Sequence, residues 1–237
     1  MKSGLQDKGV IEFFGLPGSG KTTAASALLD SGQLRSGRLS QRMVRLSGEG
    51  RLSRSLFKGR LIARHPVASA RVLRECLHVR QHVDRGRLGR FVLSVLNMMF
   101  VASLLRSGRV DRALVLDQGF FQGCWAMLRV LQPARRHELK IEPLFGIAYS
   151  AFDSDQVHLV HVHSDGREAR RRALIRAGLP DASGADAGTD IEQDEACMLL
   201  VESFIAHLLE VGAIGARHDC DDVLTQINLR TEQKEAR

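Results

Sequence analysis

Gly15–Thr22 reads Gly-Leu-Pro-Gly-Ser-Gly-Lys-Thr and decides the fold. The segment matches G-x-x-x-x-G-K-[ST] at every defined position, a pattern typical of loops that hold the phosphates of a nucleotide. Its glycines let the backbone curl until successive N–H groups point inward around a phosphate. We expect Lys21 to reach the outer phosphates and the Thr22 hydroxyl to bind Mg²⁺. The segment therefore predicts that the chain binds a nucleoside triphosphate with Mg²⁺. We expect ATP, and the motif leaves GTP as the alternative.

The residues on either side of this segment have the composition that such a loop needs. Val10–Phe14 is a short apolar run typical of a buried strand, and Lys21–Ser31 predicts a helix that stops before Gly32. A helix that begins at the loop brings its positive end to the same phosphates. The residues expected to contact the nucleotide are Gly15, Pro17, Gly18, Ser19, Gly20, Lys21, Thr22 and Thr23.

Short apolar runs alternate with helical stretches along the rest of the chain, which predicts an α/β fold with a parallel sheet. Further strands are expected at Arg42–Leu46, where the signal is weak, and at Ala113–Leu116, Gln156–His163 and Ile214–Cys220. Ser53–Arg106 predicts two or three helices, interrupted near Pro66 and Gly86/Gly89. The remaining helices are expected at Gly123–Leu131, Arg167–Ala177, Ala196–Glu210 and Asp221–Leu229. We predict one three-layer domain over residues 1–237, because a chain of this length suits a single domain with insertions.

Asp117 comes directly after the continuous apolar run Ala113–Leu116. Ligands of α/β folds bind at the carboxyl ends of the strands, and an acid at this place commonly helps to hold Mg²⁺. The alternative is a helix cap or an ordinary loop carboxylate. The next residue is Gln118, whereas motor-type ATPases usually place a second acid there to polarise water, so the sequence argues against that class.

A basic helix is predicted at Arg167–Ala177. Arg172 and Arg176 are four residues apart and share one helix face, and paired guanidinium groups suit the charge of a phosphoryl group in transfer. The alternative is a solvated basic helix that pairs with the acidic stretch Pro180–Glu195. That stretch has six acids and no basic residue, and its composition predicts a mobile loop.

Together, three features resemble the P-loop kinase superfamily, in particular its nucleoside and nucleotide kinase-like group, which includes thymidylate-kinase-like and deoxynucleoside-kinase-like proteins. The features are the loop at Gly15–Thr22, the strand that ends in Asp117-Gln118-Gly119, and the unit of strand, arginine helix and acidic stretch. The resemblance implies a P-loop three-layer sandwich with a helical insertion between strands 2 and 3. That insertion would be the basic acceptor-side region, residues 35–112. A lid of arginine helix and acidic loop, residues 165–195, would close over the phosphates.

Residue by residue, the resemblance implies that Lys21 serves the phosphates and that Arg172 and Arg176 are the lid pair. Thr22 and Asp117 would be the Mg²⁺ ligands. Related kinases often have Asp-Arg at the position of Asp117, and Gln118 departs from that pattern.

Glu49 follows the weak second strand, near the place where deoxynucleoside-kinase-like proteins carry a base. This likeness makes Glu49 a candidate to accept the proton of an attacking hydroxyl, with a surface acid as the alternative. Arg51 and Arg54 are weaker candidates for binding an anionic acceptor.

Several other polar and aromatic residues have structural interpretations. Phe120, Phe121 and Trp125 are expected to pack in the core, with an acceptor pocket as the alternative role. His161 and His163 alternate on one face of a strand and His158 lies on the other. We expect structural histidines, because a metal site would need further ligands.

The net charge of +7 is concentrated in one part of the chain. Residues 35–112 carry 17 Arg and Lys58 against four acids, a net charge of +14, which indicates an anionic partner. The alternative is that the excess of Arg over Lys reflects codon usage. The expected partner is a small phosphoryl acceptor. Widely spaced aromatics argue against nucleic acid, and the apolar run Phe91–Leu105 is short for a membrane span and predicts a buried helix. A homodimer is left open.

Targeting and redox features predict a cytoplasmic protein. The first residues are polar and lack the apolar run of a signal peptide. The four cysteines have no metal-like spacing and are expected to be buried thiols in a reducing compartment.

These observations predict an ATP- and Mg²⁺-dependent phosphotransferase that acts on a small molecule such as a nucleoside, a nucleotide or a sugar. Its catalytic residues would be Lys21, Asp117, Arg172, Arg176 and Glu49. The alternative is a partner-regulated P-loop ATPase that acts on a macromolecule. A G protein is disfavoured because the chain has no Asn-Lys-x-Asp motif for reading guanine.

Overall fold

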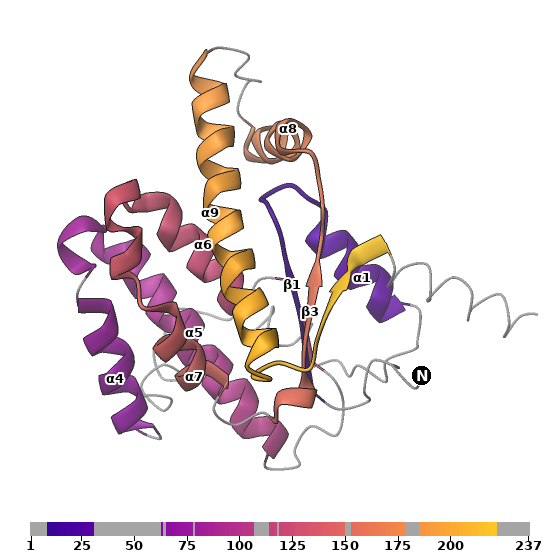
Figure 1. Ribbon diagram of the computed structural model, residues 1–237. Coiled ribbons are helices and arrows are strands. Elements are labelled where there is room, and N and C mark those ends of the chain that lie inside the picture. The colour runs from indigo at the N-terminus through magenta and orange to yellow at the C-terminus, as the bar shows by residue number, and fades with distance from the viewer. Residues whose placement is uncertain are drawn as a thin grey trace, which may run out of the picture.

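The computed structural model describes residues 9–30, 63, 65–77, 79–106, 114–117, 119–149, 153–178 and 185–221. Within these ranges the chain forms an α/β fold around a parallel sheet (Figure 1). The strands are β1 (Val10–Phe14), β2 (Leu114–Leu116), β3 (Val157–His161) and β4 (Ala216–Asp219), in the order β2-β1-β3-β4.

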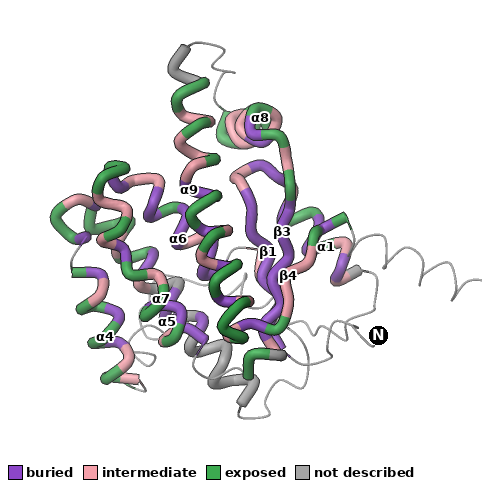
Figure 2. Tube along the Cα trace, in the orientation of Figure 1, coloured by how far each residue is buried: buried purple, intermediate pink, exposed green. Residues whose placement is uncertain are grey.

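The central strand β1 is buried along its whole length, as is its neighbour β3 (Figure 2). Val10 of β1 is in register with Leu114 of β2 on one side and with Val157 of β3 on the other. Strands buried on both faces are expected to read as continuous apolar runs, and β1 does so with the single exception of Glu12.

Helices cover both faces of the sheet, in an arrangement compatible with three layers (Figure 1). On one face, α1 (Lys21–Asp30) packs through Ala24, Ala25 and Leu28 against Ile11 and other apolar side chains of the strands. Val10 and Phe14 point to the opposite face, as the two-residue period of a strand requires. The helices in contact with that second face and with each other are α4 (Pro66–Leu77), α5 (Arg85–Arg106), α6 (Phe120–Val130), α7 (Ile141–Tyr149) and α9 (Ala185–Glu210).

Shorter elements complete the described parts of the chain. Three 3-10 segments lie at Arg80–His82, Pro133–Glu138 and Ser154–Gln156. The helix α8 (Gly166–Ala177) stands apart from the sheet layer and contacts α9 (Figure 1).

Most predicted elements are confirmed within a few residues of their expected ends. The strand at Val10–Phe14 and the helix that begins at Lys21 have the predicted bounds or differ by one residue. Pro66 begins α4, whereas Gly86 and Gly89 lie inside the first turns of α5, because Asp84 accepts hydrogen bonds from Gly86 N and Arg87 N and so caps the helix before them. The weak strand at Arg42–Leu46 and most of the predicted helix Asp221–Leu229 lie outside the described residues.

The prediction of a mobile acidic loop over Pro180–Glu195 is wrong from Ala185 onward. These residues form the first turns of α9, eleven residues before the predicted start of that helix at Ala196. Acids are favoured in the first turns of a helix because they face its positive end. Two of them, Asp190 and Asp194, also form ion pairs with Arg129 of α6, so tertiary contacts order a stretch whose composition suggested a loop.

Core packing confirms the structural interpretation of several residues. Phe120 and Phe121 have at most 1% exposure, and both lie in an aromatic cluster with Phe145 and Tyr149. All four cysteines are free and buried. Among the helices of the described ranges, none has the length and apolar character that crossing a bilayer requires.

Candidate functional site

The glycine-rich loop, residues 15–20, connects the carboxyl end of β1 to the first turn of α1. Its backbone needs glycine for two reasons. Gly18 has a φ of +87°, and a Cβ there would overlap Ala169 O in α8. Gly15 has a φ of +147°, and a Cβ there would overlap Val162 O, just after β3. The loop is therefore packed between the end of β3 and the helix α8.

Lys21 is the first residue of α1, and its side chain is buried with 7% exposure. Its Nζ donates to Gly15 O at 2.9 Å and to Leu16 O at 2.7 Å, and it lies 3.5 Å from Ser19 Oγ. Burial lowers the pKa of Lys21 to about 8; Asp117 opposes this effect and Arg176 adds to it. The loop thus encloses an ammonium group that is poorly solvated and held by neutral carbonyls, a condition that favours an incoming anion.

Thr22 and Asp117 are 95 residues apart in sequence and meet at the carboxyl ends of β1 and β2. Thr22 Oγ1 donates to Asp117 Oδ2 at 2.8 Å, and both side chains are accessible to solvent. The contact is possible because β1 and β2 are parallel neighbours, so the residues that follow them lie at the same edge of the sheet. The pair places a hydroxyl oxygen and a carboxylate oxygen beside the loop, the ligand types that Mg²⁺ prefers.

Three further residues that were predicted to contact the nucleotide, Pro17, Ser19 and Thr23, differ in their surroundings. Ser19 is buried at 6% exposure, and Ser19 N donates to Leu16 O at 3.1 Å within the loop. Pro17 lines a cavity of about 320 Å³ between the loop, α8 and α9. Thr23 is exposed in the first turn of α1, next to the helix end that carries free N–H groups.

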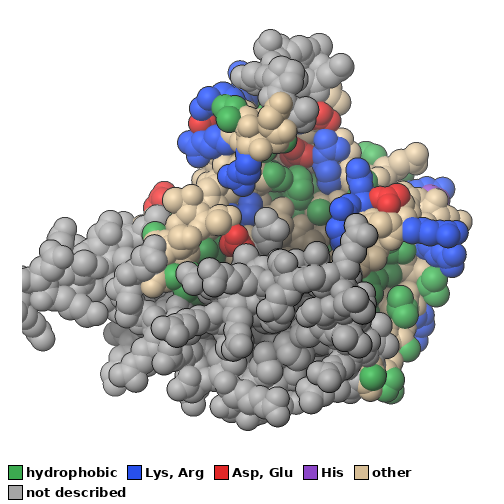
Figure 3. All heavy atoms as spheres, turned by 180° about the vertical axis from the view of Figure 1, so that it is seen from behind, with side chains coloured by type: hydrophobic (Ala, Val, Ile, Leu, Met, Phe, Trp, Pro, Cys, Tyr) green, Lys and Arg blue, Asp and Glu red, His purple; other side chains and the backbone are tan. Residues whose placement is uncertain are grey.

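The arginine helix α8 lies over the loop. Asp165 caps its start by accepting from Arg167 N and Glu168 N, each at 3.0 Å, and Gly178 ends it with a φ of +68°. Seen from behind, Lys and Arg side chains gather on α8 near the top and around a hollow below it (Figure 3).

The predicted lid pair is divided between two roles. Arg172 Nε donates to Glu168 Oε1 at 2.8 Å, and hydrogen bonds from Arg171 and Arg172 lower the pKa of Glu168 to about 2. Arg176 is exposed and has no ion pair with any residue that the structure describes. Its positive charge contributes to the lowered pKa of Lys21. Of the two arginines, Arg176 is therefore the one available to a ligand at the loop.

A network of ion pairs around Asp190 connects the arginine helix to the acidic stretch, which is the pairing that the sequence offered as the alternative role of this helix. Asp190 pairs with Arg129 of α6 at 2.9 Å and with Arg170 of α8 at 2.6 Å. Arg129 also pairs with Asp194, and Trp125 Nε1 donates to Asp194 O at 3.1 Å. The sequence analysis missed the pairs with Arg129. Their signal in the sequence was the four-residue spacing of Asp190 and Asp194, which indicates one helix face once a helix is assumed.

Glu12 is a second residue that the sequence analysis missed. It is fully buried in β1, its Oε1 accepts from Phe121 N at 2.7 Å, and its Oε2 accepts from the Tyr149 hydroxyl. Burial raises the pKa of Glu12 to about 7, against the opposing effect of these hydrogen bonds. A Cβ at Gly119 would overlap the carboxyl group. A lone acid within an apolar strand was the available signal.

Glu12 and Thr22 hold the segment after β2 from two sides. Thr22 contacts Asp117 at one end of the segment, and Glu12 contacts Gly119 and the start of α6 at the other. The position of Asp117 thus depends on contacts from both ends of the loop region.

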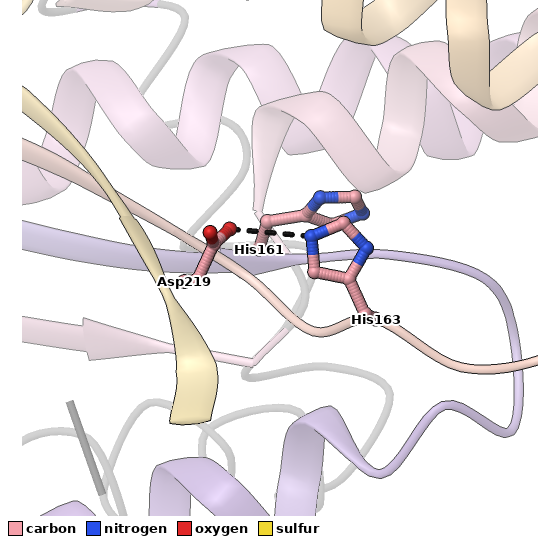
Figure 4. A group of neighbouring side chains, drawn as sticks. All are labelled: His161, His163 and Asp219. Atoms are coloured by element: carbon pink, nitrogen blue, oxygen red, sulfur yellow. Dashed lines mark hydrogen bonds and ion pairs between the residues drawn. The ribbon is translucent and has the colours of Figure 1, made fainter. Parts of the chain in front are cut away.

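The strand histidines form a small polar cluster with Asp219 of β4 (Figure 4). His163 Nε2 lies 3.2 Å from Asp219 Oδ1, and the rings of His161 and His163 are 3.8 Å apart. The structure therefore supplies the further ligand type that the sequence did not reveal. However, Arg217 lies 3.0 Å from Nδ1 of His161, and Glu202 lies 3.1 Å from its Nε2.

A metal ion at this cluster would have to displace one of these partners next to a guanidinium group. Burial, followed by the nearby charges of His163 and Arg217, lowers the pKa of His161 to about 4, and its ring stacks on Phe14 at 4.6 Å. We therefore interpret the cluster as a hydrogen-bonding network around a neutral His161, in agreement with the structural role expected for the histidines.

A cavity of about 440 Å³ lies between α5 and α6, beside Gly119. Trp125 lines it and, like Phe120 and Phe121, is buried in the core, so core packing is confirmed for all three aromatic residues. The alternative role in an acceptor pocket stays a prediction. Glu49, Arg51, Arg54 and Gln118 lie outside the described residues, and the predictions for them stay predictions.

The chain was compared with protein-family models, curated proteins and solved structures, and no significant match was found.

Proposed function

We propose that this chain is a phosphotransferase that binds ATP and Mg²⁺ at the glycine-rich loop and transfers the γ-phosphoryl group to a small molecule. The observation that carries the proposal is the 2.8 Å contact between Thr22 Oγ1 and Asp117 Oδ2. A sequence motif for phosphate binding and an independent carboxylate meet at one sheet edge, as nucleotide chemistry requires.

The electrostatics of the loop support a polyphosphate ligand. Lys21 is charged below a pKa of about 8, and Arg176 of α8 lies close enough to influence it. The first N–H groups of α1 have no partners within the helix and point toward the same place. An anion bound there would gain from all three sources of positive potential.

The residues present fit a Mg²⁺ ion. Mg²⁺ prefers hard oxygen ligands and usually keeps several waters besides one or two protein groups and substrate phosphates. Thr22 and Asp117 provide a hydroxyl and a carboxylate at the edge of the loop. When bound by them, Mg²⁺ supplies positive charge to the phosphate oxygens.

In the transfer step, an oxygen of the acceptor forms a bond to the γ-phosphorus while the bond from that phosphorus to the β–γ bridging oxygen breaks. The electron pair stays with ADP, and the proton of the acceptor leaves to a base or to water. Lys21 and Arg176 offset the charge on the phosphate oxygens, and α8 limits the access of water above the loop. Arg172 contributes to the transfer only if it leaves Glu168.

The finer architecture belongs to the same proposal. The loop is a P-loop, residues 35–112 are an acceptor-side insertion, and α8 with the start of α9 is the lid of a nucleoside or nucleotide kinase-like protein. Support comes from the order of the elements: the loop follows β1, helices α4 and α5 precede β2, and α8 follows β3.

The test is incubation of the full chain with γ-labelled ATP, Mg²⁺ and pools of nucleosides, nucleotides and sugars, followed by a search for a labelled small product. We expect a product with the wild type and a loss of about 10²-fold or more in Lys21→Ala, since a preorganised charge on the transferring group is removed. Lys140→Ala, an exposed lysine before α7, is the matched control and should behave as wild type.

A normal rate of product formation by Lys21→Ala would contradict the proposal. Labelled inorganic phosphate released only with a macromolecular partner, and no labelled small product, would favour the partner-regulated ATPase instead.

A further inference from the structure

The cavity between α5 and α6 is the best candidate for the acceptor site. Gly119 forms part of its wall and lies two residues beyond Asp117, which contacts Thr22 beside the loop. The cavity wall therefore adjoins the segment that carries Asp117, the expected Mg²⁺ ligand. Its volume of about 440 Å³ is within the range of sites for small molecules.

One side of this cavity is strongly basic. Arg87 and Arg90 lie three residues apart on α5 and so share a face. Arg87 has an exposed ion pair with Asp84 at 3.3 Å, whereas Arg90 has no ion pair with any residue in the described ranges. The third arginine of the lining, Arg129, is already neutralised by Asp190 and Asp194. The net charge that faces a ligand thus comes from α5.

The rest of the lining is mostly apolar and includes the polar side chain of Gln122. Phe91, Trp125 and Met127 are buried and line the wall. Gln122 also lines it, and its Oε1 is buried and has no hydrogen-bond partner in the part of the chain that the structure describes. A buried carbonyl oxygen without a partner is unfavourable, so a ligand that offers a hydroxyl or an N–H there would gain a hydrogen bond.

We propose that this cavity binds a small phosphomonoester, with its phosphate on Arg87 and Arg90 and its organic part against Trp125 and Gln122. Guanidinium groups match a phosphate in charge and geometry, and the aromatic wall suits a ring. The inference rests on the proposed function for the fate of the bound molecule, because it makes the phosphomonoester the phosphoryl acceptor. Both a nucleoside monophosphate and a sugar phosphate have the required chemistry.

Trp125 is the single tryptophan of the chain, so its fluorescence reports on this cavity directly. The full chain is titrated without ATP with a nucleoside monophosphate and with a sugar phosphate, each beside its dephosphorylated counterpart. We expect saturable changes for at least one phosphomonoester and none for its counterpart. The arm that responds identifies the source of the phosphate.

The variants Arg87→Gln and Arg90→Gln should each weaken that binding by about tenfold or more, the loss expected for a charged hydrogen bond. Arg71→Gln makes the same charge change at an exposed position of α4 and should bind as wild type. Equal responses to a phosphomonoester and its counterpart would overturn the inference. So would wild-type binding by both cavity variants, or no binding of any phosphomonoester by fluorescence and equilibrium dialysis.

Lys21→Ala separates this inference from the proposed function. It should lose Mg²⁺-ATP and keep the phosphomonoester, whereas Arg90→Gln should do the reverse. If the wild type binds a phosphomonoester but no ATP, the proposed function fails and the cavity assignment holds. If it binds ATP and transfers phosphate but no phosphomonoester binds, the cavity assignment alone fails.

Discussion

Glu12 lies in the central strand with no solvent exposure, and its carboxyl group is held by backbone N–H groups at the start of α6 and by Tyr149. Gly119 has no room for a side chain because the carboxyl group is there. The residue therefore fixes the start of α6, and with it the segment that leads from Asp117. Its role is positioning, since its carboxyl group is bound by the start of α6 and by Tyr149.

Replacing Glu12 with Gln should change how stability depends on pH. Burial raises the pKa of Glu12 from 4.5 to about 7, so the folded chain binds more protons than the unfolded chain between these values. The stabilising effect is present below pH 4.5 and is lost as the pH rises through 7, by about 3 kcal/mol in total. Relative to Glu12→Gln, wild type should thus lose stability between pH 5 and pH 8.

Urea denaturation at several pH values measures this difference. Glu142→Gln, at an exposed acid in the first turn of α7, is the control and should show no pH-dependent difference from wild type. A constant gap between wild type and Glu12→Gln across the range would show that the carboxyl group is ionised in the folded chain at pH 5.

For single residues, the sequence allowed prediction where the local backbone alone fixes the position of the side chain. Gly15, Lys21 and Thr22 follow from one motif, because a strand, a tight loop and a helix fix their positions. Arg90 and Glu12 could not be assigned in the same way, because their partners are brought together by packing between α5, α6 and β1. A role in ligand binding can be inferred for Arg90 only when the structure shows that it lines a cavity.

Among the elements, α8 is held in place through Asp190 of α9. The carboxylate bridges Arg170 of α8 and Arg129 of α6, and hydrogen bonds from these arginines lower the pKa of Asp190. Since α8 also contacts the loop at Gly18, the bridge connects the helix over the loop to the body of the fold.

Asp190→Asn should loosen α8 without unfolding the chain, because it weakens both ion pairs at once and leaves the core intact. Hydrogen–deuterium exchange is expected to become several-fold faster in residues 166–178 and at the start of α9, and to stay unchanged in β1 and β3. Glu192→Gln makes the same charge change at an exposed site of the same helix and should have no such effect. Unchanged exchange in α8 would mean that packing, and not the bridge, holds it.

The elements also show where prediction from sequence stops. Apolar periodicity located β1, β3 and α1 closely, since their burial determines the pattern. The start of α9 was missed because its first turns are polar and gain their order from Arg129 and Arg170. When ion pairs with other helices stabilise a helical turn, the turn needs few apolar residues, so its sequence shows little apolar periodicity.

In the whole molecule, the candidate site lies at the end of β1, where successive strands are added to opposite sides of the sheet. The chain leaves β1 and adds β2 on one side and β3 on the other, so a crevice forms at the carboxyl end of β1. The loop, Asp117 and α8 come from segments that meet only at this edge. A ligand bound there contacts several parts of the chain at once, and should stabilise the fold as a unit.

Mg²⁺-ATP at about 100 times its Kd should stabilise the folded chain by about 2.7 kcal/mol and raise Tm by about 5–10 °C. The increase should shrink as the pH rises from 7 to 9.5. The pKa of Lys21 in the free protein is about 8, so above that value the loop must take up a proton before it can hold the phosphates as a cation. Thermal unfolding with and without Mg²⁺-ATP at the two pH values measures both effects. Lys21→Ala should show little increase at either pH, and an equal increase for wild type at both would show that Lys21 does not hold the ligand by its charge.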